Sequence, residues 1–352
     1  MSNVTLQHVT KRFPGVVALQ DVSFAIDDGE FFVLLGPTGA GKTTTLRIIA
    51  GLERHDGGTI LFDDEPVDDY APADRDVAFV FQQYSLYPTM SVFDNLAFPL
   101  RSPLRRVPAE QIRTRVRDTA DKLHITHLLD RKTAHLSGGE MQRVSIGRAI
   151  IREPRVFLMD EPLSNLDAKL REALRVELQH LQKTQASTTL FVTHDQIEAL
   201  TMADRIAVLD EGCVVQMGTP DDIYDRPTTT FVARLVGTPR INLLDTAREN
   251  GALTVKGSSM ELRALSHELP ASFLLGIRPE DVTPDSEGEF AGRVALIEPL
   301  GVETILHIEI GDQTLLSLVP GMTPLRTGEN VRFSIVPDRL HYFDNDGHRI
   351  QL

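Results

Sequence analysis

The chain has 352 residues, of which 41% are hydrophobic, so two or three domains with sizeable cores are expected. Its 50 acidic side chains against 36 basic ones give a net charge of -14, which argues against bulk nucleic-acid binding and against electrostatic adhesion to anionic lipid. The single cysteine, Cys213, excludes a disulfide framework and is typical of a reducing, cytosolic compartment, and the lack of an uncharged bilayer-length apolar run leaves any membrane role to a partner.

Short apolar or alternating runs at 4–8, 22–26 and 32–35 predict strands. The third run leads into a loop that fits the phosphate-binding pattern G-x-x-x-x-G-K-[ST]. Apolar residues at helical spacing predict a helix directly after it, over 44–50. The candidate nucleotide-binding residues are Gly36, Pro37, Thr38, Gly39, Ala40, Gly41, Lys42, Thr43 and Thr44.

The composition of this loop predicts its chemistry. Glycines let successive backbone N–H groups turn inward, and at a helix N-terminus such groups form an anion site that the helix dipole favours. Lys42 is placed to reach the outer phosphates of a nucleotide, and the hydroxyl of Thr43 can contact Mg²⁺. The alternative is a glycine-rich turn that matches the motif by chance. The strand predicted before the loop and the helix predicted after it argue against that alternative.

Runs at 58–62 and 77–81 predict two more strands, and from about 91 to 135 the spacing becomes helical. In the stretch from Gln82 to Phe98, which follows the second of these strands, apolar residues are candidates for receiving a helix of a partner protein. The alternative is that they only pack within the helical region. These residues are Tyr84, Leu86, Tyr87, Met90 and Phe93.

Two further motifs carry polar groups. Residues 136–142 form a second glycine turn, in which Ser137 is a good helix N-cap, and capping alone is the plainer explanation of that turn. A continuous apolar run at 156–159 predicts a strand buried on both faces, and Asp160 and Glu161 follow at its C-terminal end, where open α/β sheets bind ligands. Asp160 suits a Mg²⁺ contact and Glu161 is a candidate to polarise an attacking water, the alternative being an acidic turn before a proline.

The remaining pattern of the first part alternates helix and strand. A helix is predicted from Asp167 to Gln185, a strand at 188–192 with His194 just beyond it, and a hairpin at 206–217. Strands that alternate with helices up to about 235 indicate an α/β core.

Taken in order, these motifs resemble the ATP-binding subunits of ABC transporters over residues 4–235. The resemblance implies an α/β P-loop NTPase cassette with a mixed-sheet core and a helical subdomain at about 84–155. It also implies two subunits, forming a homodimer, that meet head to tail with two ATP molecules between them. Each ATP would lie between the phosphate loop of one subunit and the turn Ser137-Gly138-Gly139 of the other.

The same resemblance assigns roles to single residues. Phe13 would stack on adenine, and Gln82 would sense the γ-phosphate and Mg²⁺. Glu161 would activate water, and His194 would hold the γ-phosphate and the reacting geometry, although a histidine at a strand end can also be purely structural. Asp167 would belong to the turn that joins the two subunits.

One position departs from the family pattern. Residue 140 is Glu, where the family usually has Gln after the two glycines. The phosphate-facing groups of Ser137 and the following N–H groups are unchanged, but an extra negative charge near ATP could weaken closure of the dimer.

Beyond about residue 240, short strand-like runs punctuated by Gly and Pro predict a small all-β domain. Residues 276–280 and 298–301 resemble the accessory β-domain of carbohydrate-type importer ATPases. We therefore expect an ABC nucleotide-binding domain at 1–236 and an OB-like accessory or regulatory domain at 237–352. The implied function is ATP hydrolysis that energises uptake of a glycoside, an oligosaccharide or a glycerol phosphate ester.

The implied ligands are ATP and Mg²⁺. The implied partners are transmembrane permease subunits, a second ATPase subunit and, indirectly, a periplasmic or extracellular solute-binding protein, with no nucleic acid. The chain would attach peripherally to the cytoplasmic face of the bacterial inner (plasma) membrane.

Three alternatives stay open at this point. The chain could serve an importer of a polyamine, iron or sulfate. It could be a soluble ABC ATPase acting on DNA or ribosomes, although that class predicts coiled-coil insertions, tandem cassettes or basic extensions that the sequence lacks. It could be a regulatory binding module in which ATP acts as a switch, against which the intact Asp160, Glu161 and His194 argue.

Overall fold

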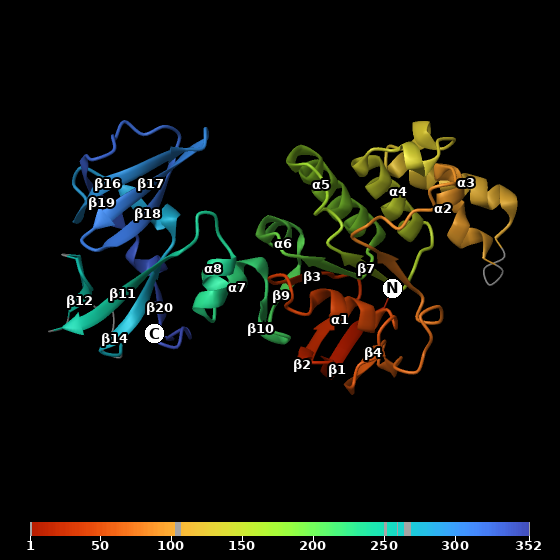
Figure 1. Ribbon diagram of the computed structural model, residues 1–352, viewed down its shortest axis with the longest axis horizontal. Helices are drawn as coiled ribbons and strands as arrows, with labels where there is room; N and C mark the ends of the chain where they lie inside the picture. The colour runs from red at the N-terminus through yellow and green to blue at the C-terminus, as the bar shows by residue number, and fades with distance from the viewer. Residues whose placement is uncertain (1, 103–106, 250–251, 259, 264–268, 352) are drawn as a thin grey trace. The chain divides into compact units, whose positions relative to one another are not determined.

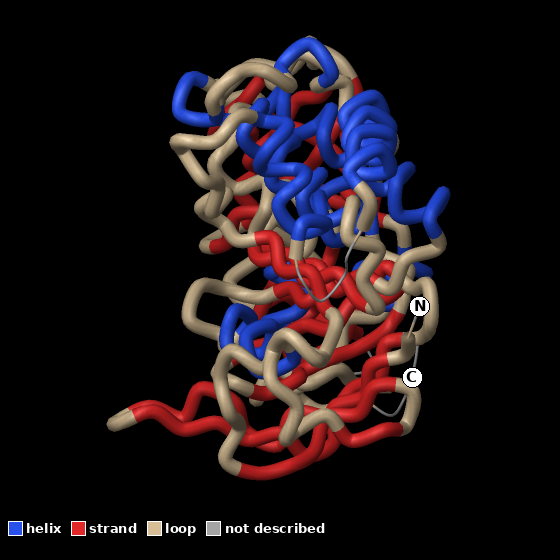
Figure 2. Tube along the Cα trace, turned by 90° about the vertical axis from the view of Figure 1, so that its right-hand side faces the viewer, coloured by secondary structure: helices blue, strands red, loops and turns tan. Residues whose placement is uncertain are grey.

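The computed structural model describes residues 2–102, 107–249, 252–258, 260–263 and 269–351. By their internal contacts these residues divide into two compact units, Met1–Pro220 and Asp221–Leu352, whose elements are labelled in Figure 1. None of the described helices, drawn in blue in Figure 2, is both long and apolar enough to cross a membrane.

A six-stranded sheet in the order β10-β9-β3-β8-β7-β6 forms the centre of the first unit. β10 pairs antiparallel with β9, and the other neighbours run parallel. Every residue of β3, β7 and β8 is buried, as expected for apolar runs covered on both faces. The bounds are β3 Phe31–Leu35, β6 Val77–Val80, β7 Val156–Asp160, β8 Thr189–Thr193, β9 Arg205–Asp210 and β10 Cys213–Gly218.

A second, antiparallel sheet in the order β2-β1-β4-β5 shares one hydrophobic core with the first sheet and with α1 (Lys42–Ile49). Its bounds are β1 Val4–Phe13, β2 Val16–Ile26, β4 Gly57–Phe62 and β5 Glu65–Pro66. The rings of Phe24 on β2 and Phe32 on β3 stack with centroids 5.2 Å apart, and Leu46 of α1 is fully buried in the same cluster. The core therefore fixes α1, and the loop before it, against both sheets.

Helices make up the part of the first unit between β6 and β7, and the predicted helical character of 91–135 is confirmed. Prolines divide it: Pro99 lies in a 3₁₀ turn and Pro108 caps the next helix, since proline cannot continue a helix from within. The elements are α2 Val92–Ala97, η1 Phe98–Arg101, α3 Ala109–Lys122, η2 Thr126–Leu128, η3 Thr133–His135 and α4 Gly138–Ile150. After β7 come α5 Ala168–Gln185 and α6 Gln196–Met202, and α5 confirms the helix predicted there.

The second unit contains two five-stranded antiparallel sheets, in the orders β13-β12-β11-β14-β20 and β15-β19-β16-β17-β18. Side chains of both sheets, among them Phe273, Val294 and Phe333, share one core, which confirms the predicted all-β character. The bounds are β11 Asn242–Glu249, β12 Ala252–Val255, β13 Glu261–Arg263, β14 Ser272–Ile277, β15 Val282–Pro284, β16 Phe290–Pro299, β17 Glu303–Ile310, β18 Gln313–Pro320, β19 Asn330–Ile335 and β20 His341–Phe343, with 3₁₀ turns η4 Pro279–Asp281 and η5 Pro337–Arg339.

Two short helices, α7 (Pro220–Asp225) and α8 (Thr230–Leu235), precede these sheets in the chain, and Ala233 of α8 shares a small buried cluster with Phe343 of β20. Arg278, which is 1% exposed, donates from its guanidinium to the carbonyl oxygens of Tyr224, Ala233 and Val236 at 2.6–3.1 Å. These bonds tie the segment 221–236 to the β unit. The internal contacts thus divide the chain after Pro220, and the domain boundary at 236 stays a prediction.

Candidate functional site

The predicted phosphate loop joins β3 to the N-terminus of α1. A Cβ atom at Gly36 would lie 2.2 Å from the carbonyl oxygen of Leu209, and Gly41 has a φ of 105°, so both positions favour glycine. No side chain caps the N-terminus of α1. Its first N–H groups are therefore left to bind an anion.

Lys42 lies over this loop and is only 5% exposed. Its Nζ donates to the carbonyl oxygens of Gly36 and Pro37, both at 2.9 Å, and lies 3.6 Å from an oxygen of Glu161. Burial lowers the pKa of Lys42, while the negative charges of Glu161 and Asp160 oppose that shift. The ammonium is thus held where a phosphate on the loop would meet it. Thr38, Gly39 and Ala40 lie in the loop between β3 and α1, as predicted, and Thr44 lies in the first turn of α1.

Thr43 and Asp160 form a pair of oxygen donors at the end of β7. Thr43 Oγ1 donates to Asp160 Oδ1 at 2.9 Å, and burial raises the pKa of Asp160. A hydroxyl and a carboxylate are the hard ligands that Mg²⁺ takes when substrate phosphates complete its shell. The described residues hold no cluster of three or more His, Cys, Asp or Glu fit for a metal.

The carboxylate of Glu161 is the meeting point of the site. Glu161 Oε2 lies 3.0 Å from Nδ1 of His194, which follows β8, and accepts a hydrogen bond from Nε2 of Gln82, which follows β6, at 3.4 Å. Glu161 itself has a φ of 44°, a backbone strain of the kind that clusters at functional sites. The ends of three neighbouring strands, together with Lys42, therefore meet at one acidic group.

The loop 163–167, between β7 and α5, contacts Gln82, which is one of the residues that meet at Glu161. Ser164 Oγ accepts from Gln82 Nε2 at 3.3 Å, and Asn165 Nδ2 donates to the backbone oxygen of Gln82 at 2.9 Å. Asp167 caps α5 by accepting from the N–H of Leu170 at 3.0 Å. The sequence analysis assigned Asp167 in this loop but not the contacts of Ser164 and Asn165.

Phe13, at the end of β1, is 40% exposed. The ammonium of Lys11 lies 4.9 Å from its ring centroid. The neighbouring strand β2 carries Ala18, whose carbonyl oxygen would lie 2.5 Å from a Cβ at Gly41. Phe13 is thus an open aromatic ring on the hairpin that packs beside the phosphate loop.

The turn Ser137-Gly138-Gly139 is not part of this group. No hydrogen bond or ion pair connects it to Lys42 or Glu161 within the described ranges. Ser137 caps α4 in a capping box: its Oγ accepts from the backbone N–H of Glu140 at 3.4 Å, and Glu140 Oε2 accepts from Ser137 N at 2.7 Å. Glu140 Oε2 also accepts from Ser137 Oγ at 2.8 Å. These bonds lower the pKa of Glu140. The prediction that Ser137 caps a helix is confirmed, and its phosphate role stays a prediction.

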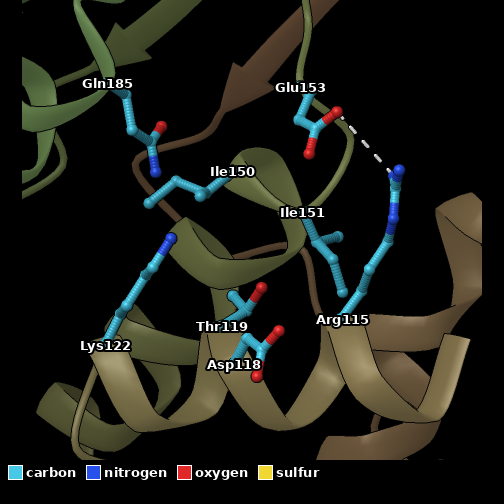
Figure 3. A pocket seen from close by; sticks show the side chains of 8 residues that line it. All are labelled: Arg115, Asp118, Thr119, Lys122, Ile150, Ile151, Glu153 and Gln185. Atoms are coloured by element: carbon cyan, nitrogen blue, oxygen red, sulfur yellow. Dashed lines mark ion pairs between the residues drawn. The ribbon is translucent and has the colours of Figure 1, made fainter. Parts of the chain in front are cut away.

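Figure 3 shows a separate cavity of about 230 Å³ between α3 and the end of α4. Arg115 and Glu153 form an ion pair of 3.8 Å at its rim. Both side chains are exposed to solvent, where such pairs contribute little. None of its lining residues belongs to the predicted site, and we assign it no function.

Comparison with known proteins bears on the whole chain. A family model described as "ABC transporter" matches residues 19–164, and one described as "TOBE domain" matches residues 275–343. The chain is 46% identical to the sn-glycerol-3-phosphate import ATP-binding protein UgpC of Jannaschia sp. (strain CCS1), covering 99% of each. It is 45% identical to the trehalose/maltose import ATP-binding protein MalK of Thermococcus litoralis, covering 98% of each.

Among solved structures, the chain resembles a dimeric ATP-binding cassette in a post-hydrolysis state bound to ADP and Pi. The TM-score is 0.56 at 31% sequence identity, over 62% of this chain and 98% of that one. The predicted fold class, a cassette followed by an all-β domain, is confirmed.

Proposed function

The chain belongs to the ATP-binding subunits of ABC transporters and is an ATPase of that family, and from this premise we propose that it energises the import of a sugar or sugar-like solute. The solute class rests on relatives named for import of sn-glycerol 3-phosphate and of trehalose or maltose. Both relatives are matched from end to end, including the TOBE domain.

The observation that carries the hydrolytic mechanism is the group around Glu161. In this proposal the phosphate loop and Lys42 bind the outer phosphates of ATP, and Glu161 accepts a proton from the attacking water. Its neighbours Gln82 and His194, which contact the same carboxylate oxygen, orient the water and the γ-phosphate. Phe13 stacks on the adenine.

Thr43 and Asp160 would hold Mg²⁺ together with phosphate oxygens, because their oxygen atoms already lie 2.9 Å apart. Bound there, Mg²⁺ would neutralise charge that develops on the phosphates.

We further propose that two identical subunits meet head to tail. The turn 137–139 has its N–H groups at the start of a 13-residue helix. Among the described residues, no hydrogen bond or ion pair joins this turn to its own phosphate loop, which supports the proposal. In a head-to-tail dimer that turn faces the partner's ATP, and Asp167 lies in the segment between the two sites.

The membrane partner would be a permease, with the chain attached peripherally at the cytoplasmic face. A groove of about 380 Å³ suits a partner helix. The rings of Tyr87 and Phe98 lie 4.6 Å apart there, and both are more than one-third exposed. Of the predicted patch only Tyr87 lines the groove; Tyr84, Leu86, Met90 and Phe93 are half-buried, as the packing alternative expects of them. The lining is Ala78, Phe79, Phe81, Ser85, Tyr87, Phe98, Pro99, Ser145, Arg148, Ala149 and Arg152.

The test is copurification of the chain with its permease subunits, followed by solute screening on the cognate solute-binding protein. We expect a glycoside, an oligosaccharide or a glycerol phosphate ester to bind and to stimulate ATP hydrolysis by the assembled complex in vesicles. Glu161→Gln complexes serve as the inactive control. Stimulation by a polyamine, iron or sulfate alone would contradict the solute class, and failure to hydrolyse ATP would contradict the whole proposal.

A further inference from the structure

Arg171, on the first turn of α5, lies beside the Glu161 group. Among the described residues it has no hydrogen bond or ion pair to Glu161, Gln82 or His194. Its guanidinium forms hydrogen bonds to the loop after Glu161 and an ion pair with the residue after His194. Nε donates to the carbonyl oxygen of Leu163 at 3.3 Å, and Nη2 donates to those of Ser164 and Leu166 at 3.4 and 3.0 Å.

The fourth contact of the Arg171 guanidinium is with Asp195, which follows the end of β8. Arg171 Nη1 lies 3.5 Å from Oδ2 of Asp195, and both side chains are largely shielded from solvent. The other oxygen of Asp195, Oδ1, caps α6 by accepting from the N–H groups of Ile197 and Glu198. Asp195 is therefore fixed on one side by α6 and on the other by Arg171.

The two segments that Arg171 joins carry the pair that meets at 3.0 Å, Glu161 Oε2 and His194 Nδ1. A planar guanidinium presents its donors in a rigid fork, so the positions of the loop carbonyls and of Asp195 are set relative to one another. The loop also contacts Gln82 through Ser164 and Asn165. One side chain thus connects the loop that contacts Gln82 with the residue that follows His194.

We propose that Arg171 is a positioning residue for ATP hydrolysis, which acts by holding the loop 163–166 and Asp195 in one fork. The inference rests on the proposed roles of Glu161 and His194. It has a second consequence: a displacement of the loop by a partner subunit would be transmitted through Arg171 to the His194 side of the site.

The test separates turnover from binding. Arg171→Met removes all four contacts, and Arg171→Lys keeps the charge but loses the fork. Because Lys42 and the phosphate loop are untouched, KM for ATP should stay within about twofold, while kcat should fall by about 10- to 100-fold, as for other small misplacements of reacting groups. Lys should not restore kcat.

A double-mutant cycle with Asp195→Asn tests the link itself. Asn is a good N-cap, so α6 should persist, and the substitution should lower kcat in the parent but add little in Arg171→Met, since contacting residues are non-additive. Where Arg171→Met does not fold, Arg171→Lys completes the cycle.

Arg143→Met is the matched control. Arg143, on α4, also bonds to α5, through Glu177 at 2.6 Å, and to the carbonyl oxygen of Leu123. Among the described residues it has no hydrogen bond or ion pair to Glu161, His194 or the loop 163–166. It should lower thermal stability and leave kcat unchanged. An unchanged kcat in both Arg171 variants, additive effects in the cycle, or an equal kcat loss in Arg143→Met would overturn the inference. A parent chain that hydrolyses no ATP would instead refute the proposed function.

Discussion

Glu161 is the residue whose replacement tests the mechanism most directly. Gln is nearly isosteric with Glu, so contacts through Asp160, Thr43 and Lys42 should survive in Glu161→Gln. The lost acceptor should lower kcat by about 10²- to 10⁴-fold, the usual contribution of a positioned general base. ATP affinity should hold or rise. Size-exclusion chromatography with ATP and Mg²⁺ should show a dimer that dissociates when the metal is chelated.

Asp160→Asn provides the contrast, because it should lose Mg²⁺-dependent nucleotide binding itself. If Glu161→Gln hydrolyses ATP at the parent rate, Glu161 is not the base. His194, 3.0 Å away, would then become the leading candidate for that role.

Glu140 places a carboxylate where the partner's phosphate is expected. It holds both the N–H and the hydroxyl of Ser137, so in Glu140→Gln a phosphate would meet no competing charge. A charge at a helix N-terminus is worth about 0.3–1 kcal/mol, which corresponds to about twofold to fivefold. We expect Glu140→Gln, in the Glu161→Gln background, to lower the ATP concentration for half-maximal dimerisation by about that factor.

The effect of Glu140→Gln on the melting temperature should depend on pH. The pKa of Glu140 is lowered in the folded chain by its bonds to Ser137, so its stabilising effect is present above the ordinary glutamate pKa and is lost as pH falls through the lowered one. Parent melting temperatures should exceed those of Glu140→Gln at neutral pH, and the difference should shrink in acid. An equal difference at all pH values would contradict the capping role.

Single residues differ in how far the sequence predicts them. Lys42, Thr43, Asp160 and Glu161 could be identified from the phosphate-loop motif and the strand pattern, and Gln82 and His194 through the family resemblance. The structure brings these six residues together. Arg171 could not be identified, since its partners are mainly backbone carbonyl oxygens, which carry no sequence signal. The bond from Glu140 to Ser137 likewise needed the geometry of the helix start.

Elements were predicted best where one periodicity runs unbroken. α5 begins one residue after the predicted start because Asp167 is its cap. The fully buried strands β3 and β7 lie where the sequence has continuous apolar runs. The region 91–135 was predicted only as helical in character. Its division into short helices depends on prolines and on packing against α4, which local spacing does not encode.

The segment 221–236 raises the question of where the cassette ends. The predicted boundary leaves α7 and α8 with the cassette, whereas Arg278 bonds them to the β unit. We propose that residues 237–352 are dispensable for folding of the cassette. Chains ending at Pro220 and at Val236 should both stay soluble and bind ATP.

The two truncated chains should differ under limited proteolysis. In the chain ending at Val236, the segment 221–236 lacks Arg278 and should be cut quickly, leaving a core that ends near Pro220. A protected segment would show that α7 and α8 belong to the cassette. Aggregation of both chains would mean that the two units share one core.

At the scale of the whole molecule, the proposal that two subunits share each ATP can be tested with two variants, each inactive alone, that should complement each other in one dimer. Lys42→Ala removes the cation that meets the outer phosphates, and Ser137→Arg blocks the turn that serves the partner. In a head-to-tail dimer each variant alone spoils both sites. Both should therefore be inactive, but Ser137→Arg should still bind a first nucleotide in its own phosphate loop.

A mixture of the two variants forms some dimers in which one site is intact, because Lys42 comes from one subunit and Ser137 from the other. Those mixed dimers should regain turnover or trap one nucleotide each, measured after separating dimers from free ATP. The matched control is each variant mixed with itself at the same total concentration. If the mixture does neither, and Ser137→Arg alone has also lost its nucleotide, then Ser137 serves its own subunit's site. Since no hydrogen bond or ion pair joins Ser137 to Lys42 or Glu161 among the described residues, that outcome would require α4 to move relative to β3.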